Sequence, residues 1–270
     1  MRNMPRFGTP GNGPRGGVLE CRAMPAPPSP ALPPAPLLVG VATRTVTLRT
    51  LAAQPAGSAR VDLVEARVDL FDAADVASWA EAAARLETTG TRVLVTIRLA
   101  TEGGRWSRPE PERLALYHEA IDVASWLDVE AASALAPTVA KAARARGRTT
   151  IVSHHDFART PPLAELMRIA AACRAAGGDV AKIATRVNGP EDIEALFALL
   201  GAEPRGTCVI GMGQGTDAET LRVELAARGS LLAYGYLDAP TAPGQPSAAE
   251  LDARLRAASD AYSARRGVTA

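Results

Sequence analysis

The chain has 270 residues, 47% of them hydrophobic, a length and composition that suit one large domain around a single core. Its 30 basic and 29 acidic side chains give a formal net charge of +1, so no overall field favours a nucleic acid or an anionic membrane surface. The absence of any run of about 18 apolar residues argues against a membrane-spanning helix. We therefore expect a small-molecule partner, with neither nucleic acid nor membrane involved.

Residues 1–36 form a distinct N-terminal segment that is rich in Gly and Pro and shows no helical or strand periodicity. This composition predicts a disordered extension. Prolines interrupt every apolar stretch that follows Arg2 and Arg6, so a secretory signal is not expected. Residues 37–270 are expected to form a single folded domain.

Three cysteines, Cys21, Cys173 and Cys208, are isolated in the sequence and show no CxxC spacing. This pattern favours neither a disulfide framework nor a structural zinc site. We therefore expect a protein of the reducing cytoplasm that holds no metal.

Eight short apolar segments follow one another along the domain, at 37–43, 61–67, 93–98, 123–130, 149–155, 179–185, 207–212 and 231–237. Ala-rich amphipathic segments lie between them, at 75–86, 112–121, 133–146, 163–176, 190–200 and 217–227. This alternation predicts parallel strands joined by helices, in the α/β class. A closed (β/α)₈ barrel fits eight such units, with a doubly wound open sheet as the competing arrangement.

Polar residues recur at the predicted ends of these strands, where a barrel carries its active site. They are Glu65, Arg67, Arg98, Asp128, Glu130, His155, Lys182 and Met212. Residues two apart on a strand project from the same face. Glu65 and Arg67 are therefore expected on one face of their strand, and so are Asp128 and Glu130. Core packing does not account for such a convergence of charged groups, and an active site does.

Lys182 is the candidate nucleophile. Arginine is the usual cation of this chain, whose only lysines are Lys141 and Lys182. Alternation places Lys182 on one strand face with Val180 and Ala184, and such apolar surroundings favour the neutral amine that attacks a carbonyl, which a guanidinium cannot do. The alternative is an ion-paired or snorkelling lysine. Lys141, on a predicted helix, is interpreted as a surface charge.

His155 and Glu102 are candidates for acid–base work. His154 and His155 are neighbours on one strand, so at most one of them faces the interior, where an imidazole could transfer protons near neutral pH. Glu102 follows a strand end and precedes Gly103 and Gly104. A carboxylate there could orient an imidazole, and the alternative is an ordinary surface carboxylate.

Anion binding is expected after the last two strands, a region that often holds charged substrate groups in barrels. Arg222 could bind a carboxylate with two parallel hydrogen bonds, although local sequence alone favours an exposed helical arginine. The glycines of 211–215 do not have the spacing of a nucleotide-binding loop, so this segment is interpreted as a turn between strand and helix.

Taken in order, nine short segments resemble the type I 3-dehydroquinate dehydratases. They are EARVDLF (65–71), TIR (96–98), EGG (102–104), DVE (128–130), SHHDF (153–157), KIA (182–184), MG (212–213), Arg222 and TAPGQ (241–245). The resemblance implies a (β/α)₈ barrel, commonly a homodimer, that converts 3-dehydroquinate to 3-dehydroshikimate by syn elimination in the shikimate pathway. It also implies a lyase that works through a covalent imine, without a metal or other cofactor.

The resemblance further implies a role for each residue at these positions. Lys182 would form the imine at C3, and His155 would move the C2 proton to the departing C1 hydroxyl. Glu102 and Asp128 would orient His155. The remaining positions would hold the substrate: Glu65, Arg67 and Arg98 at the ring hydroxyls, Arg222 at the carboxylate, Thr241, Ala242 and Gln245 in a closing loop, and Met212 and Tyr234 as apolar walls.

The chain departs from the family pattern in places. Leu221 stands where a serine usually precedes the carboxylate-binding arginine, two extra residues separate that arginine from Met212, and Thr241 replaces a serine. The first strand has no clear match to a small hydroxyl residue of the family pocket, and the family's N-terminal hairpin is not recognisable in residues 1–36.

Two other functions are compatible with a barrel. A class I aldolase would share the Schiff-base lysine, but no phosphate-binding glycine pattern follows strands seven and eight. A degenerate barrel that only binds quinate-like ligands would have no use for an amine beside a base.

Overall fold

The computed structural model describes residues 31–32, 36–55, 58, 60–203, 206–213 and 216–267. Apart from residues 31, 32 and 36, the predicted N-terminal extension lies outside the described residues, and so does Cys21. Within the described part of the chain, no helix is long and apolar enough to cross a membrane.

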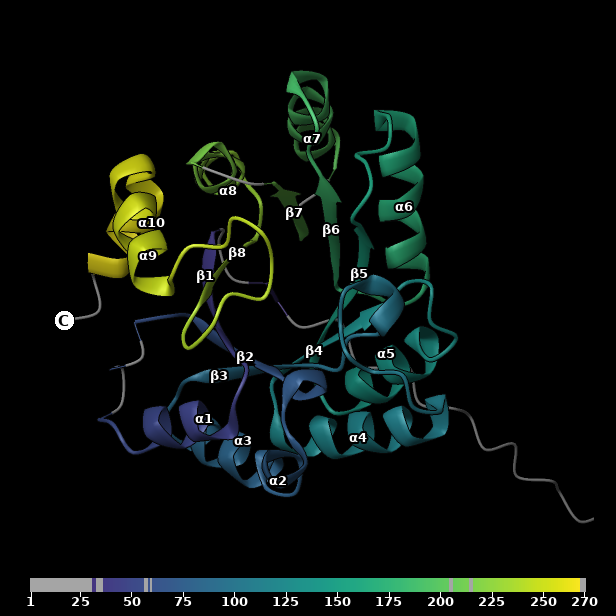
Figure 1. The fold of residues 1–270 in the computed structure, drawn as a ribbon, viewed down its shortest axis with the longest axis vertical. Coiled ribbons are helices and arrows are strands. Elements are labelled where there is room, and N and C mark those ends of the chain that lie inside the picture. The colour runs from purple at the N-terminus through teal and green to yellow at the C-terminus, as the bar shows by residue number, and fades with distance from the viewer. Residues whose placement is uncertain are drawn as a thin grey trace, which may run out of the picture.

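Eight strands alternate with helices along the chain (Figure 1). The strands are β1 (Leu37–Ala42), β2 (Leu63–Arg67), β3 (Arg92–Thr96), β4 (Trp126–Glu130), β5 (Thr149–Asp156), β6 (Val180–Arg186), β7 (Thr207–Met212) and β8 (Leu232–Tyr236). The helices are α1 (Thr45–Ala52), α2 (Ala73–Val76), α3 (Trp79–Thr88), α4 (Glu110–Val123), α5 (Ala136–Ala145), α6 (Leu163–Ala175), α7 (Pro190–Ala202), α8 (Thr216–Ala227), α9 (Ala248–Ala258) and α10 (Asp260–Gly267). Short 3-10 turns, η1 (Val68–Leu70) and η2 (Ala100–Glu102), follow β2 and β3.

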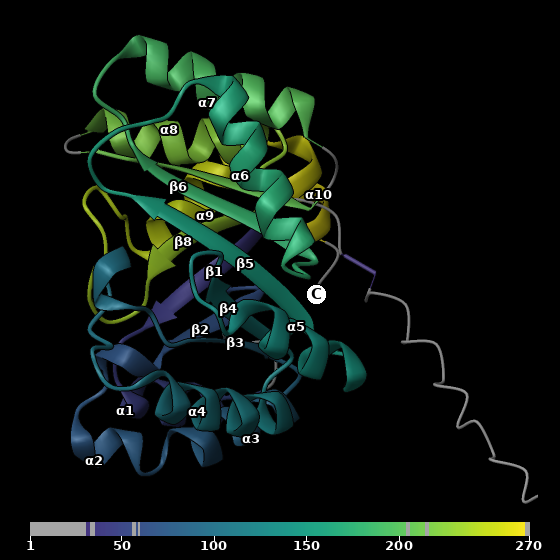
Figure 2. The same ribbon diagram turned by 90° about the vertical axis from the view of Figure 1, so that its right-hand side faces the viewer.

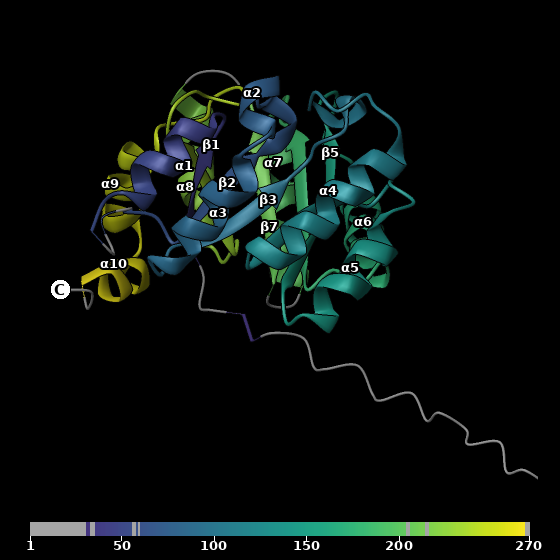
Figure 3. The same ribbon diagram turned by 90° about the horizontal axis from the view of Figure 1, so that it is seen from below.

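Every strand pairs in parallel with its neighbours in the order β7-β6-β5-β4-β3-β2-β1-β8. The last strand, β8, pairs with the first, and Leu231 N–H donates to Thr207 O across the remaining gap between β8 and β7. The helices surround the strands (Figures 1 and 2), and α1, α3 and α4 cover the outer side of the first strands (Figure 3). The predicted (β/α)₈ barrel is confirmed, and the open doubly wound sheet is wrong.

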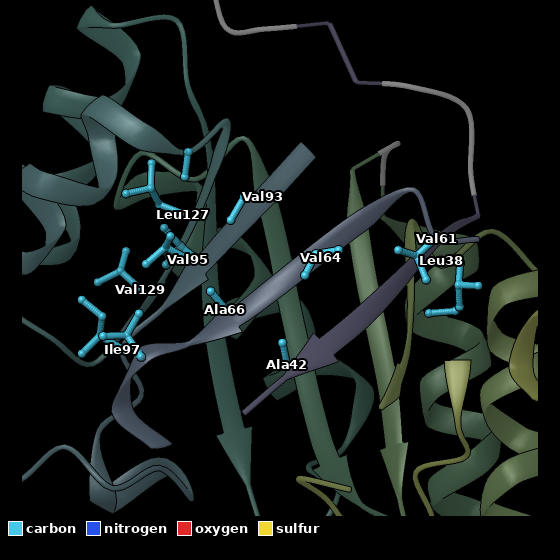
Figure 4. Packing of buried hydrophobic residues seen from close by; sticks show 14 of the residues in the cluster. Leu38, Ala42, Val61, Val64, Ala66, Val93, Val95, Ile97, Leu127 and Val129 are labelled. Carbon is cyan, nitrogen blue, oxygen red and sulfur yellow. The ribbon is translucent and has the colours of Figure 1, made fainter. Parts of the chain in front are cut away.

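Strand alternation separates two apolar layers. Leu38 and Val64 point outward and join the cluster packed between the barrel and its helices (Figure 4). Val39, Leu63 and Leu94 belong instead to a smaller cluster inside the barrel. Because both faces are buried, the strands read as nearly continuous apolar runs.

The element boundaries differ from the sequence prediction in a few places. Helix α1 was not expected, because β-branched residues fill half of its sequence TVTLRTLA and such residues have low helix propensity. Tertiary contacts compensate: Leu48 is fully buried, and Thr45 hydrogen-bonds to Asp75. The segment 75–86 divides into α2 and α3, and β4 begins only at Trp126 because α4 extends to Val123.

Gly235 provides a test of the packing between β8 and α9. A Cβ at Gly235 would lie 2.6 Å from Cα of Ala248 and 2.7 Å from its backbone N. Because backbone cannot move aside as a flexible side chain can, Gly235→Ala should lower the free energy of unfolding by about 1–3 kcal/mol in urea titration. Gly201→Ala, on α7 with open space around it, is the matched control and should be neutral or slightly stabilising.

Candidate active site

A cavity opens at the carboxyl ends of the strands. Its lining includes every substrate-binding and catalytic position proposed from the sequence: Glu65, Arg67, Arg98, Glu102, His155, Lys182, Met212, Arg222, Tyr234, Thr241, Ala242 and Gln245. Asp128, fully buried, lies behind this surface. His154 does not line the cavity, as expected for the neighbour of an inward-facing histidine.

Lys182 lies at the base of the cavity with a carboxylate as its partner. Its Nζ donates to Oδ2 of Asp128 at 2.9 Å and lies 4.3 Å from the centroid of the Tyr234 ring. The apolar surroundings expected from the sequence hold for Ala184 and Val180 on the same strand face, but not for the amine itself. The ion-paired alternative therefore describes Lys182 in this structure.

Asp128 links the lysine to a buried arginine. Its Oδ2 is 2.8 Å from an NH2 group of Arg98, and its Oδ1 accepts from the Ser153 hydroxyl at 2.6 Å. Burial opposes the negative charge, but Arg98 and Lys182 hold the pKa of the Asp128 carboxyl well below its usual range. The described contacts join Asp128 to these three residues and not to His155, the partner that the resemblance implies.

Glu130 extends the network to the outer helices. Its Oε1 accepts from Arg98 at 3.0 Å, and its Oε2 accepts from Arg113 of α4 at 2.6 Å. Arg113, fully buried, also donates to Ser133 at 2.7 Å. Both carboxylate oxygens of Glu130 are therefore paired, and Arg98 is held in place from β4 and β5.

His155 and Glu102 form the second functional pair. The Nδ1 of His155 is 2.9 Å from Oε2 of Glu102, and the same oxygen accepts from the His155 backbone N–H at 3.0 Å. Burial lowers the pKa of His155 well below its usual value, and Arg98 and Lys182 lower it further. Burial also raises the pKa of Glu102 to about 7, although Arg98 opposes this. The imidazole is therefore neutral at pH 7 and can accept a proton.

Two glycines and Phe157 set the position of Glu102. Gly103 has φ of 78°, in the left-handed region that favours glycine, and a Cβ there would lie 2.3 Å from the Phe157 ring. A Cβ at Gly104 would lie 2.1 Å from the carbonyl oxygen of Arg98. The glycine pair of this loop therefore allows the chain to fold back closely enough for Glu102 to reach His155.

Glu65 and Arg67 line the cavity from β2. Thr96 donates to Oε1 of Glu65 at 2.7 Å. Arg67 donates from Nε and NH2 to the two carboxylate oxygens of Asp69, at 2.9 and 2.8 Å. Thr96 of β3 thus holds Glu65, and Asp69 of η1 holds Arg67. Both side chains keep further hydrogen-bonding capacity for a ligand.

Arg222 differs from the other arginines of the site. Its side chain donates to the carbonyl oxygens of Gly244 and Pro243, at 3.0 and 3.2 Å, and among the described residues no carboxylate forms an ion pair with it. Burial lowers its pKa to about 10, so it still carries its charge at neutral pH. The local interpretation as an exposed helical arginine is wrong, because Arg222 is 6% exposed.

The loop of residues 241–245 packs against this arginine and lines the same cavity. Thr241 donates from its backbone N–H and its hydroxyl to Oε1 of Gln245, at 2.7 and 3.0 Å. The loop carbonyls meanwhile accept from Arg222. The Thr241 hydroxyl therefore helps to shape the loop.

Sequence reasoning missed four side chains that shape this site: Asp69, Arg113, Ser153 and Phe157. Ser153 and Phe157 fall within the SHHDF segment, whose alternation offered a signal for Ser153, because it shares a strand face with His155. Arg113 has no local signal, since a charged residue on a helix usually faces solvent.

The fold and site together define a (β/α)₈-barrel enzyme with a buried lysine, a histidine–glutamate pair and a cation free to bind an anion around one cavity. A family model described as Type I 3-dehydroquinase matches residues 38–261. The chain belongs to this family.

Several relatives support this assignment. The 3-dehydroquinate dehydratase of Methanosarcina barkeri is 34% identical over 193 residues, covering 68% of this chain and 80% of the relative. That of Thermococcus gammatolerans is 35% identical over 191 residues, covering 70% and 84%. The crystal structure of the 3-dehydroquinate dehydratase from Aquifex aeolicus has a TM-score of 0.69 at 25% identity, covering 82% of this chain and 98% of that one.

Removal of the Asp128 carboxylate tests the network beneath the cavity. Asp128→Ala would leave Lys182 and Arg98 without their shared partner in a buried site, so the free energy of unfolding should fall by about 3–5 kcal/mol. Ser153→Ala removes one neutral donor beside the same carboxylate and should cost about 1 kcal/mol. Urea titration of both variants measures the difference, and equal small losses would mean that Asp128 does not hold the network together.

Proposed function

We propose that this protein converts 3-dehydroquinate to 3-dehydroshikimate and water through an imine on Lys182. The observation that supports this proposal is the placement of one lysine, one neutral histidine and one unneutralised arginine around a single cavity. The substrate offers a ketone to the lysine, an acidic C–H to the histidine and a carboxylate to the arginine. Each of its reactive groups therefore has a matching side chain.

Lys182 acts first. The neutral amine attacks C3, a proton passes from nitrogen to the carbonyl oxygen to give a carbinolamine, and loss of water from the carbinolamine leaves a C=N bond to Nζ. Protonated, this iminium accepts the electron pair released when the C2 proton is removed, so the reaction needs no metal or organic cofactor as an electron sink.

His155 then carries out the elimination. Its Nε2 takes the C2 proton while Glu102 accepts from Nδ1 and fixes the tautomer. The electron pair moves into the iminium and returns to form the C1–C2 double bond as the C1–O bond breaks, and the departing hydroxyl takes the proton from His155. Hydrolysis of the imine consumes one water and releases Lys182, so the net products are 3-dehydroshikimate and one water.

Binding is divided among the other lining residues. Arg222 pairs with the substrate carboxylate, and Thr241, Ala242 and Gln245 form the loop over it. Glu65, Arg67 and Arg98 face the ring hydroxyls. Met212 and the ring of Tyr234 supply apolar walls.

We also propose that the protein works as a homodimer in the cytoplasm, as its resemblance to the family implies. The two described cysteines, Cys173 and Cys208, are unpaired and buried, which suits a reducing compartment. Light scattering on the purified protein measures the oligomeric state directly.

Borohydride trapping provides the first test of the mechanism. The wild-type protein incubated with 3-dehydroquinate should produce enone absorbance and, after reduction, an adduct on the peptide that contains Lys182. His155→Ala should lose roughly 10²- to 10⁴-fold in turnover and still form the adduct, because it lacks only the base. Lys182→Met should form none. Turnover without an adduct at Lys182 would exclude the imine mechanism.

The pH dependence of kcat/KM tests the His155–Glu102 pair. With its pKa near 7, Glu102 loses its proton as the pH rises, and the carboxylate accepts from Nδ1 and stabilises the charge that His155 gains when Nε2 takes a proton, which the neutral acid does far less well. Activity should therefore rise with pH through about 7 and then level off. Glu102→Gln should lower kcat/KM by roughly 10² to 10⁴ and remove this ascending limb. An unchanged pH profile in the variant would assign the titration to another group.

Arg222→Ala tests carboxylate recognition. Loss of a charged hydrogen-bonded pair of about 2–4 kcal/mol should raise KM by roughly 30- to 700-fold, with a smaller effect on kcat. Arg222→Lys is the control, because it keeps the positive charge and loses the planar guanidinium. Its KM should lie between that of the wild type and that of Arg222→Ala. If KM were unchanged in the alanine variant, the arginine would serve only the closing loop.

A further inference from the structure

Arg113 is a fully buried arginine on α4, one of the helices outside the strands (Figure 3), and it does not line the active-site cavity. Its NH1 group donates to the carbonyl oxygen of Ile97 at 3.0 Å and to Oε2 of Glu130 at 2.6 Å. Its NH2 group donates to Ser133 at 2.7 Å and to Glu110 at 3.1 Å. These directed bonds hold the guanidinium in one place, against the ends of β3 and β4.

Glu130 passes this contact on to the catalytic groups. Its second oxygen, Oε1, accepts from Arg98 at 3.0 Å and from the backbone N–H of Leu99 at 3.0 Å. Leu99 directly precedes η2, the turn that ends at Glu102. One carboxylate oxygen therefore holds both the Arg98 side chain and the start of the turn that carries Glu102.

Charges of opposite sign alternate from the surface of α4 to the base of the cavity. The ion pairs join, in order, Glu110, Arg113, Glu130, Arg98, Asp128 and Lys182. Glu110 is 41% exposed, whereas the side chains of the other five are buried. Without the cation of Arg113, both oxygens of a buried carboxylate would draw on Arg98, which already pairs with Asp128.

The charge of Glu130 also reaches the acid–base pair. Burial raises the pKa of Glu102 to about 7, Arg98 lowers it, and the negative charges of Glu130 and Asp128 raise it, while the backbone N–H of His155 lowers it. A Glu130 carboxylate that lost its outer cation would raise the pKa of Glu102 further, because its negative charge would be less balanced.

We propose that Arg113 is a positioning residue that acts on the reaction through Glu130. With Arg113 in place, Glu130 holds Arg98 and the start of η2 without adding an unbalanced negative charge to the site. In the function proposed above, on which this inference rests, Glu102 orients the base His155. A purely structural arginine would supply hydrogen bonds alone, whereas a positioning arginine must also supply its charge.

The pH dependence of kcat/KM for 3-dehydroquinate separates these two roles. Arg113→Gln keeps a donor and removes the charge, so the ascending limb should move to higher pH by roughly half a unit. This is less than the roughly 1–3 units that a charge in direct contact causes, because Glu130 lies between. kcat should fall by roughly 10- to 10²-fold, the effect of a small misplacement of reacting groups. Arg113→Lys keeps the charge and should return the limb to its wild-type pH.

Tyr117→Phe is the matched control. Tyr117, also fully buried and one turn further along α4, donates from its hydroxyl to the backbone oxygen of Asp128 at 2.8 Å. Its loss removes a neutral bond between the same helix and strand, so urea titration should show lower stability while the ascending limb stays in place. Glu130→Gln removes the carboxylate charge itself and should move the limb to lower pH.

The outcomes separate this role from the function on which it rests. A wild-type protein that does not turn over 3-dehydroquinate would overturn both. If the wild type is active and its limb does not move in Arg113→Gln or in Glu130→Gln, only the role of Arg113 is overturned, and Glu130→Gln decides this even if Arg113→Gln does not fold. Equal movement of the limb in Arg113→Gln and Tyr117→Phe would show that a loosened helix is the cause, and would also overturn it.

Discussion

The carboxylate of Asp128 between Lys182 and Arg98 is the interaction on which the site depends. These three charged groups are buried in the barrel, where an unpaired ion is strongly destabilising. The folded barrel is therefore stable only when the three groups are paired with one another. The three residues come from β4, β6 and the end of β3, and Ser153 joins them from β5. The network therefore forms only if four neighbouring strands pair in the correct register, and it ties catalytic geometry to the fold.

Arg222 is a buried cation of the cavity that no carboxylate neutralises among the described residues. Asp128 pairs with Lys182 and Arg98, and Glu130 pairs with Arg98 and Arg113, whereas within the described residues Arg222 donates only to backbone carbonyls. An anionic substrate group therefore gains most beside Arg222, which orients the substrate before chemistry begins. Burial lowers the pKa of His155 and raises the pKa of Glu102. Exclusion of water from the cavity therefore sets the protonation of both groups and also strengthens the attraction between Arg222 and an anion.

Much of this arrangement could be predicted from the sequence, because the fold fixes where the residue at the end of each strand must lie. Parallel strands of a closed barrel end at one rim, so residues at the ends of β2 to β7 must converge even when they are far apart in the chain. Helix α1 and Arg113 were missed for the opposite reason. The helix propensity of α1 is low and the charge of Arg113 is ordinary for a helix, and their burial depends on partners from other elements, Asp75 for α1 and Glu130 for Arg113.

Lys182 and Tyr234 show the limit of reasoning from strand alternation. Alternation correctly places both inside the barrel, but it cannot say what the end of a long side chain will meet, and both were interpreted as members of apolar surroundings. The lysine amine donates to the carboxylate of Asp128, and the tyrosine hydroxyl has no hydrogen-bond partner among the described residues.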